Sequence, residues 1–196
     1  MFDAIMTRFT PPLRFTIPAL IVVSGFSIGA IQFVLEVQDA NRRAEQSSII
    51  NLKSSASQTA RMVDYLYRTD DEADQVVSLI SRLGANPGYL SVRLFSDRNI
   101  VLRSSEYNQV GHSIALTDAA PMAFIFSQAR RTLRGTVCLS QDRSYLSAVY
   151  PILLKPLPGE LMPSRVGLFF VKYGLTEAKT SAFREALGRA LLFLIR

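Results

Sequence analysis

Cysteine and histidine are almost absent from this chain of 196 residues, which has one of each. The single cysteine, Cys138, excludes an intrachain disulfide and any cysteine-rich zinc site. It lies in the strand-like run TVCLS, where we expect a buried and unreactive thiol. The sequence also lacks a glycine-rich phosphate-binding loop, a cluster of metal ligands and a pair of acids at useful spacing. We therefore expect no catalytic activity, no bound metal and no cofactor.

Charged residues are scarce too, at 19% of the chain, while apolar residues reach 48%. This composition favours a membrane segment. The net charge of +6 invites a nucleic-acid interpretation, but the 22 basic residues are spread along the chain without a dense Lys/Arg run. Most of them are arginine, whose planar guanidinium also suits carboxylates. We expect no nucleic-acid partner.

The longest uncharged stretch is FTIPALIVVSGFSIGAIQFVL, from Phe15 to Leu35. A membrane-crossing helix needs about 20 such residues. A secretory signal peptide has a shorter apolar core that ends at a small-residue cleavage site, whereas this stretch continues into LEVQDANRR. We predict an N-terminal tail over residues 1–14 and an uncleaved transmembrane helix over residues 15–36.

Two short patterns overlap inside this segment, at Gly25, Ser27 and Gly29. They fit the G-x-S-x-G pattern of hydrolases, which requires a strand-to-helix turn and downstream Asp and His partners. The two glycines also form G-x-x-x-G, a close-packing face for a neighbouring transmembrane helix. A helix in lipid suits the second use, and we predict a homodimer through the transmembrane and stalk helices.

Apolar spacing predicts an α+β domain after the membrane segment. From Asp39 to about Tyr67 there is no glycine or proline, and apolar residues recur at steps of three and four, which indicates a long helix with a polar stalk at its start. The predicted elements, in order, are helices over 39–67 and 69–83, strands over 89–95 and 100–103, a helix over 119–132, strands over 136–139, 145–154 and 165–173, and a helix from 176 onward. Such a five-stranded, mostly antiparallel sheet carries its long N-terminal helix on one face.

Two sets of apolar side chains are predicted to be covered. On the long helix we expect Ile49, Leu52, Ala56 and Val63 to face the sheet or a partner helix. On the second helix, which starts at Thr69-Asp70-Asp71-Glu72 with acids in its first turn, the predicted buried face is Val76, Val77, Leu79, Ile80 and Leu83.

Four motifs stand in a fixed order within residues 39–179. They are FSDRNIVLRSS at 95–105, VGHSI at 110–114, SAVYPIL at 147–153 and VGLFFVKYGLTEAK at 166–179. Their order and spacing resemble the extracytoplasmic PAS-like sensor domains, often called Cache or PDC domains, of bacterial membrane receptors. In the first motif Asn99 replaces the usual turn glycine, and asparagine also tolerates the left-handed conformation.

The resemblance implies the sensory input domain of a histidine kinase, diguanylate cyclase or chemoreceptor, outside the cytoplasm and anchored in the inner membrane. It implies a pocket for a small carboxylate or amino acid between the free face of the sheet and the loops around the central helix. Candidate ligand-binding residues are Arg103, His112, Arg131, Arg134, Arg143 and Tyr145. Each also has a structural interpretation, as a solvated edge residue, a helix C-terminal cation or an exposed surface histidine.

Two questions stay open at the level of sequence. Basic residues flank the apolar segment on both sides, so their count does not set its orientation. The alternative function is a bitopic structural or assembly protein whose α+β domain binds another protein and no small ligand. A filled sheet face would favour that alternative, and a cavity with convergent polar groups would favour the sensor.

The end of the chain, residues 180–196, is predicted to be an exit helix. It is either the start of a second membrane segment in a longer receptor or a last turn that touches the membrane interface. From Ala182 we predict one amphipathic helix beside the start of the stalk, with Arg196 near Asp39, because a buried arginine disfavours deep insertion.

Overall fold

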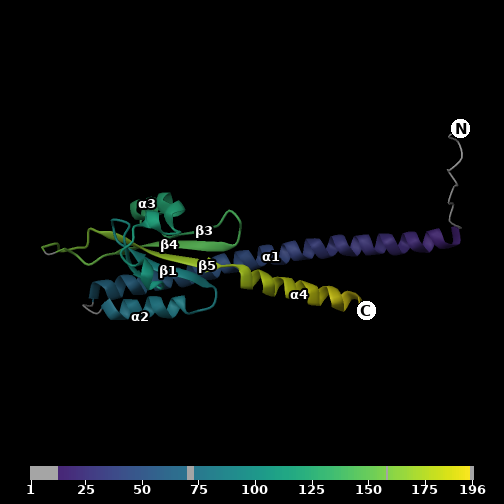
Figure 1. Ribbon diagram of the computed structural model, residues 1–196, viewed down its shortest axis with the longest axis horizontal. Coiled ribbons are helices and arrows are strands. Elements are labelled where there is room, and N and C mark those ends of the chain that lie inside the picture. The colour runs from purple at the N-terminus through teal and green to yellow at the C-terminus, as the bar shows by residue number, and fades with distance from the viewer. Residues whose placement is uncertain (1–12, 70–72, 158, 195–196) are drawn as a thin grey trace, which may run out of the picture. The chain divides into compact units, whose positions relative to one another are not determined.

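The computed structural model describes residues 13–69, 73–157 and 159–194, and it has the predicted α+β fold (Figure 1). The chain divides into two compact units. One is Arg43–Ser181, which holds the sheet, and the other joins Met1–Arg42 to Ala182–Arg196.

The helices and strands follow the predicted order, with boundaries shifted by a few residues. The helices are α1 (Leu13–Thr69), α2 (Ala73–Gly84), α3 (Ala123–Thr132) and α4 (Thr176–Leu194), and short 3-10 turns η1 (Tyr107–Gln109), η2 (Ile114–Leu116) and η3 (Ala120–Met122) precede α3. The strands are β1 (Tyr89–Phe95), β2 (Val101–Ser104), β3 (Thr136–Leu139), β4 (Tyr145–Leu153) and β5 (Val166–Gly174). The predicted transmembrane and stalk segments belong to one continuous helix, α1. The predicted acidic start of the second helix, Asp70 to Glu72, lies outside the described residues.

The sheet has the order β2-β1-β5-β4-β3, and every neighbouring pair is antiparallel. The last strand in the chain, β5, therefore lies at the centre, as its nearly continuous apolar run predicted. Leu168 and Phe170 project from one face of β5, and Phe169 and Val171 project from the other. Both faces are consequently covered.

The first covered face packs against α1 and α2, which lie on the same side of the sheet (Figure 1). Leu52, Ala56 and Val63 of α1 are buried in this cluster, so the sheet is what they face. On α2 the prediction holds for Val76 and Ile80, which are buried, but it is wrong for Val77, which is 40% exposed. Val77 follows Val76 directly, and a helix rotates consecutive side chains by about 100°.

The second covered face packs against α3. Phe126 of α3 contacts Phe95 and Phe170 of the sheet, with ring centroids 5.0 and 5.8 Å apart. These tilted and edge-to-face contacts suit the quadrupoles of aromatic rings. Of the two phenylalanines in the predicted apolar run of α3, Phe126 is buried and Phe124 is 76% exposed.

The β1–β2 turn has the backbone that its sequence predicted. Asn99 adopts the left-handed conformation with φ of 61°. Ser96 Oγ accepts hydrogen bonds from the backbone N–H groups of Arg98 and Ile100, and Arg130 of α3 donates to Asn99 Oδ1 at 2.7 Å. The stretch around this turn is a structural hairpin, and the arginine that holds it from α3 was not among the residues predicted from the sequence.

In the other unit, α4 lies beside α1. The ring of Phe183 contacts that of Phe33 with centroids 6.3 Å apart, and Arg189 Nη1 lies 3.9 Å from Glu36 Oε1. These contacts lie near the predicted start of the stalk, and Arg196 itself lies outside the described residues.

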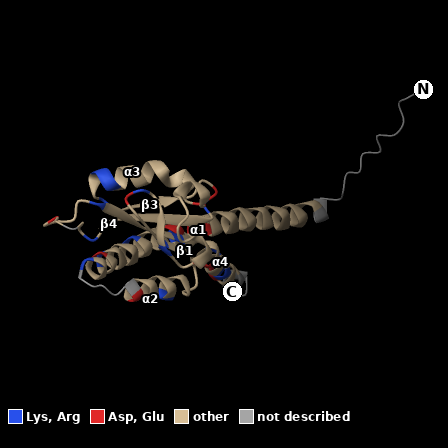
Figure 2. Ribbon diagram, turned by 60° about the vertical axis from the view of Figure 1, so that its left-hand side comes forward, with Lys and Arg blue, Asp and Glu red and all other residues tan. Residues whose placement is uncertain are grey.

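Among the described residues, α1 is the one helix long and apolar enough to cross a membrane, by length and composition. Its N-terminal half carries no charged residue between Arg14 and Glu36 (Figure 2). Ser27 Oγ donates to the Val23 carbonyl oxygen at 2.8 Å, so Ser27 lies inside a helix and not on the strand-to-helix turn that the G-x-S-x-G pattern of hydrolases requires.

Candidate functional site

The structure spreads the sequence-predicted ligand residues over several places. His112, Arg131 and Arg134 are exposed at the surface. His112 lies in the loop before η2, where its backbone carbonyl accepts from Val101 N–H at 2.9 Å. Arg103, half-buried on β2, donates to the carbonyl of Leu102 at 2.8 Å.

Arg143 has a partner inside the fold. It lies in the β3–β4 turn with φ of 56°, and its guanidinium forms an ion pair with Glu45 of α1. Lys179 of α4 lies 2.9 Å from the same carboxylate and donates to the Arg143 carbonyl at 2.7 Å. We name these three residues the Glu45 clamp, because they join α1, the β3–β4 turn and the start of α4.

Tyr145 belongs to a different group of polar side chains, on the α3 side of the sheet. Lys172 of β5 lies over the Tyr145 ring, 4.3 Å from its centroid, and donates to Asp118 Oδ2 at 2.7 Å. Arg93 of β1 forms an ion pair with the other oxygen of Asp118. Glu106 approaches Arg93 at 3.7 Å. These five residues are the Arg93–Lys172 cluster.

The pairing register explains why these side chains meet. Ser91 of β1 pairs with Lys172 of β5, and Lys172 pairs with Ser147 of β4, so the three residues form a row across the sheet. Arg93 pairs with Phe170 in the next row on the same face. Directly opposite residues in antiparallel strands place their side chains on one face. Asp118 reaches this face from the loop between η2 and η3.

The electrostatics of the cluster centre on Asp118. Its partial burial alone would raise the pKa of its carboxyl group, but the hydrogen bonds and positive charges of Lys172 and Arg93 outweigh burial, and the pKa is lowered. Arg93 is 1% exposed, and its guanidinium carbon also lies 5.9 Å from the centroid of the Phe170 ring. A buried guanidinium is retained only where acceptors compensate its lost hydration.

Two buried polar atoms beside this ion pair are unsatisfied. Within the part of the chain that the structure describes, neither Ser91 Oγ nor Arg93 Nε has a hydrogen-bond partner. Ser91 is 2% exposed. Buried donors and acceptors are almost always paired, so unpaired ones next to a cationic group point to a ligand or water that completes them.

Arg93 and Lys172 were not among the residues predicted from the sequence, although the sequence contains a signal for them. Both interrupt apolar strand patterns, YLSVRLF and VGLFFVKYG. A charge inside a run that is otherwise buried needs a partner in the folded state. The partner, Asp118, is 54 residues from Lys172 in sequence, and only the sheet register brings it near. No group of His, Cys, Asp or Glu suited to a metal occurs among residues 13–69, 73–157 and 159–194.

Comparison with known proteins gives distant structural neighbours. No family model and no curated protein matches the chain. The chain is similar to an extracellular ligand binding receptor from Desulfohalobium retbaense DSM5692, with 11% identity, a TM-score of 0.47, and coverage of 82% of this chain and 27% of that one. It is also similar to the sensor domain of the histidine kinase DctB from V. cholerae, with 12% identity, a TM-score of 0.37, and coverage of 84% and 60%.

Both likenesses are distant, with identities of 11% and 12%. The chain spans 27% and 60% of the lengths of these two proteins. Neither likeness assigns a ligand or a binding residue to this chain.

Proposed function

We propose that this chain is the sensory input domain of a membrane receptor, which binds a small extracellular carboxylate or amino acid at the Arg93–Lys172 cluster. The observation that carries the proposal is the convergence of two cations from adjacent strands on one carboxylate, with Ser91 Oγ and Arg93 Nε unsatisfied beside them. Guanidinium and ammonium donors that converge on one point recognise carboxylates.

Asp118 holds the position that the carboxylate of a ligand would take. It lies on a loop and is 41% exposed, whereas Arg93 and Lys172 are fixed by the sheet. A ligand carboxylate that replaced Asp118 between the two cations would release the η2–η3 loop. The ligand then shifts the population toward a state in which this loop has moved.

The path to the output runs along β5. Lys172 lies near the end of β5, and α4 begins at Thr176. The Glu45 clamp ties the first turn of α4 to α1 and to the β3–β4 turn. A change at Lys172 would therefore reach the junction of the first and last helices, and displacement of α4 relative to α1 would be the signal. We place the domain outside the cytoplasm, anchored by α1 in the inner membrane, as the front part of a histidine kinase or diguanylate cyclase.

The test is a thermal-shift screen of the full chain in detergent against small dicarboxylates, monocarboxylates and amino acids. A ligand that binds the folded state raises the melting midpoint by mass action. We expect Lys172→Gln to abolish the shift. Asp118→Asn should strengthen it, because both cations then lack their internal carboxylate. Arg131→Gln is the matched control, since Arg131 is exposed outside the cluster.

If a ligand raises the melting midpoints of Lys172→Gln and Arg131→Gln equally, the Arg93–Lys172 cluster is not its binding site. A flat screen across all compounds would favour the second candidate, a bitopic assembly protein that binds another protein. That second function would use exposed apolar side chains as contacts, and Leu161 and Met162 of the β4–β5 loop are 101% and 81% exposed.

A further inference from the structure

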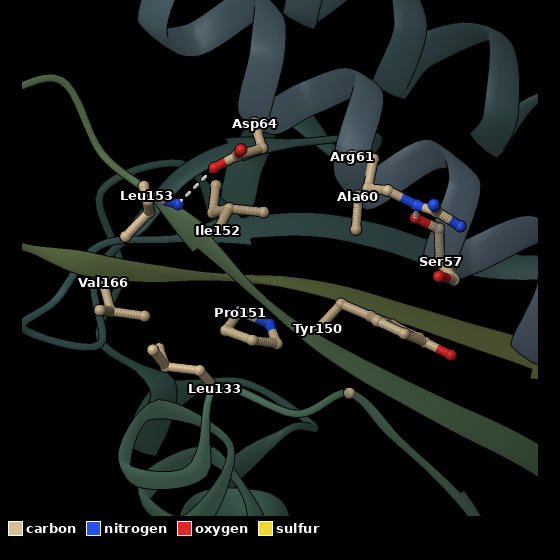
Figure 3. A pocket seen from close by; sticks show the side chains of 11 residues that line it. Ser57, Ala60, Arg61, Asp64, Leu133, Tyr150, Pro151, Ile152, Leu153 and Val166 are labelled. Atoms are coloured by element: carbon tan, nitrogen blue, oxygen red, sulfur yellow. Dashed lines mark hydrogen bonds between the residues drawn. The ribbon is translucent and has the colours of Figure 1, made fainter. Parts of the chain in front are cut away.

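A second candidate site lies at the free edge of β4, in a cavity of about 380 Å³ between α1 and the second half of this strand (Figure 3). Ligand pockets in proteins have volumes of about 300–1,000 Å³. Its walls come from α1, from the chain between α3 and β3, and from β4 and β5. The lining residues are Ser57, Ala60, Arg61, Asp64, Leu133, Gly135, Tyr150, Pro151, Ile152, Leu153 and Val166.

The cavity exists because β3 is shorter than its neighbour. The pairing of β3 ends at Thr136 with Val149, while β4 continues to Leu153. Before β3 the chain turns away at Leu133, with φ of 52°, and passes Tyr150 at Gly135. A Cβ atom at Gly135 would lie 2.1 Å from the Tyr150 ring, so only glycine allows this approach. The outer side of residues 150–153 is left without a strand among the described residues.

This free edge offers no N–H group to an incoming strand. The Leu154 N–H group donates to the Arg165 carbonyl oxygen, on the side of β5. The N–H groups of an antiparallel strand point alternately to its two sides, so those of Tyr150 and Ile152 also point toward β5. Of the two outward residues, Pro151 has no N–H, and Leu153 N–H donates to Asp64 Oδ1 at 2.6 Å (Figure 3). Proline and an inward carboxylate are typical protection of a sheet edge. A peptide strand is therefore disfavoured as occupant, and a small molecule is favoured.

The charges of the cavity favour an anion. Asp64 is neutralised by the ion pair with Arg68 one turn later on α1. Arg61 forms no ion pair with any described acidic residue, and its one internal hydrogen bond is a long contact of 3.5 Å from Nε to the Ser57 carbonyl. Its terminal amino groups are available to a ligand. Most of the remaining wall is apolar, with the Tyr150 ring and Pro151 on the strand side (Figure 3).

We propose that this cavity binds a small amphipathic monocarboxylate, with its carboxylate on Arg61 and its apolar body against Tyr150, Pro151 and Ile152. A planar guanidinium binds a carboxylate through two parallel hydrogen bonds. The apolar body gains by leaving water for the wall of the cavity. This site is separate from the Arg93–Lys172 cluster, which lies on the α3 side of the sheet.

The test uses the full chain in detergent, with hexanoate and benzoate as probes and hexylamine and benzyl alcohol as charge controls. Binding is measured by isothermal titration calorimetry and by saturation-transfer NMR of the probes. We expect hexanoate or benzoate to bind at millimolar concentration or below, and hexylamine not to bind. Arg61→Gln should weaken binding about tenfold, as expected for the loss of a charge-assisted hydrogen bond. Ser57→Phe, which fills the cavity from α1, should abolish it.

Arg82→Gln on the exposed side of α2 is the matched control for loss of an arginine, and it should bind as the parent does. Arg61 is exposed, so its replacement leaves the fold intact even if Ser57→Phe does not fold. Equal affinity of Arg61→Gln and Arg82→Gln, or equal binding of hexylamine and hexanoate, overturns the proposal. So does the absence of any probe binding. Binding lost in Lys172→Gln but kept in Arg61→Gln would assign the probe to the Arg93–Lys172 cluster instead.

Discussion

Glu45 shows how much of this fold depends on single charged residues placed at junctions. Its side chain is 6% exposed, and its two cationic partners come from segments about 100 or more residues away in sequence. The fold removes the carboxylate of Glu45 from water, and the two cations compensate for the lost hydration. Only the carboxylate side of this ion pair is buried, because the Arg143 side chain is 57% exposed, so the pair gives modest net stability.

At the residue scale we therefore predict that Glu45→Gln lowers the melting midpoint of the full chain by a few degrees. The expected loss is small, because solvent at the exposed Arg143 weakens its hydrogen bonds to the carboxylate. Differential scanning fluorimetry at pH 7 measures it. Glu177→Gln is the control, because Glu177 is exposed at the start of α4. A midpoint for Glu45→Gln that matches this control would show that the clamp contributes nothing.

The same residue predicts a dependence on pH. The hydrogen bond from Arg143, and then Lys179, lowers the pKa of Glu45 from its usual value of 4.5 against the opposing effect of burial. A carboxyl group with a lowered pKa stabilises the folded state above the unfolded-state pKa, and this contribution disappears as the pH falls through the folded-state pKa. The difference in midpoint between parent and Glu45→Gln should be full at pH 6–7 and shrink below about pH 4.5. A constant difference down to pH 3 would contradict it.

At the element scale, substitutions at Asn99 in the β1–β2 turn distinguish the effect of backbone conformation on stability from the effect of a side-chain hydrogen bond. We predict that Asn99→Ala destabilises the domain more than Asn99→Gly. Both changes remove the hydrogen bond from Arg130, but glycine keeps the left-handed backbone without strain, while alanine adds about 1 kcal/mol. Urea denaturation of both variants gives the comparison. Equal stabilities would mean that the turn changes its conformation in the alanine variant.

Elements with strong local patterns were predictable from the sequence. Three local patterns each predicted the structure that is observed. They are the alternation in YLSVRLF, which forms β1, the turn at Asn99, and the apolar run that forms β5. The polar contacts were not predictable in this way. Arg130 and Arg131 are adjacent in α3, and only helix rotation against the sheet decides that Arg130 reaches the hairpin while Arg131 faces water. Pairings such as Lys172 with Asp118 depend on register across distant strands.

At the scale of the whole molecule, the outer surface of α1 sets the expected assembly. The buried stripe of α1 faces the sheet, which leaves Ile50 and Met62, 67% and 54% exposed, on the surface. In a homodimer along α1 these side chains would be the covered ones. We predict that Ile50→Cys crosslinks between copies of the full chain in membranes and that Leu52→Cys does not, because Leu52 is buried at 3% exposure.

Oxidative crosslinking followed by non-reducing electrophoresis measures this difference, in a background where Cys138 is replaced by serine. Crosslinking of both variants to the same extent would indicate unfolding or random collision. Absence of crosslinks at Ile50 and at neighbouring exposed positions of the stalk would show that α1 does not mediate a dimer.

The contact between Lys172 and the Tyr145 ring also has an optical consequence. The chain has seven tyrosines and no tryptophan, so tyrosine emission is not drained by energy transfer to an indole. We expect the Lys172 ammonium group, 4.3 Å from the centroid of the Tyr145 ring, to perturb the emission of this tyrosine through its electric field. Any ligand that draws Lys172 away from the ring should therefore change the ultraviolet fluorescence of the unlabelled protein, and Tyr145→Phe should remove this change. The protein would then carry its own spectroscopic reporter of what happens at the centre of its sheet.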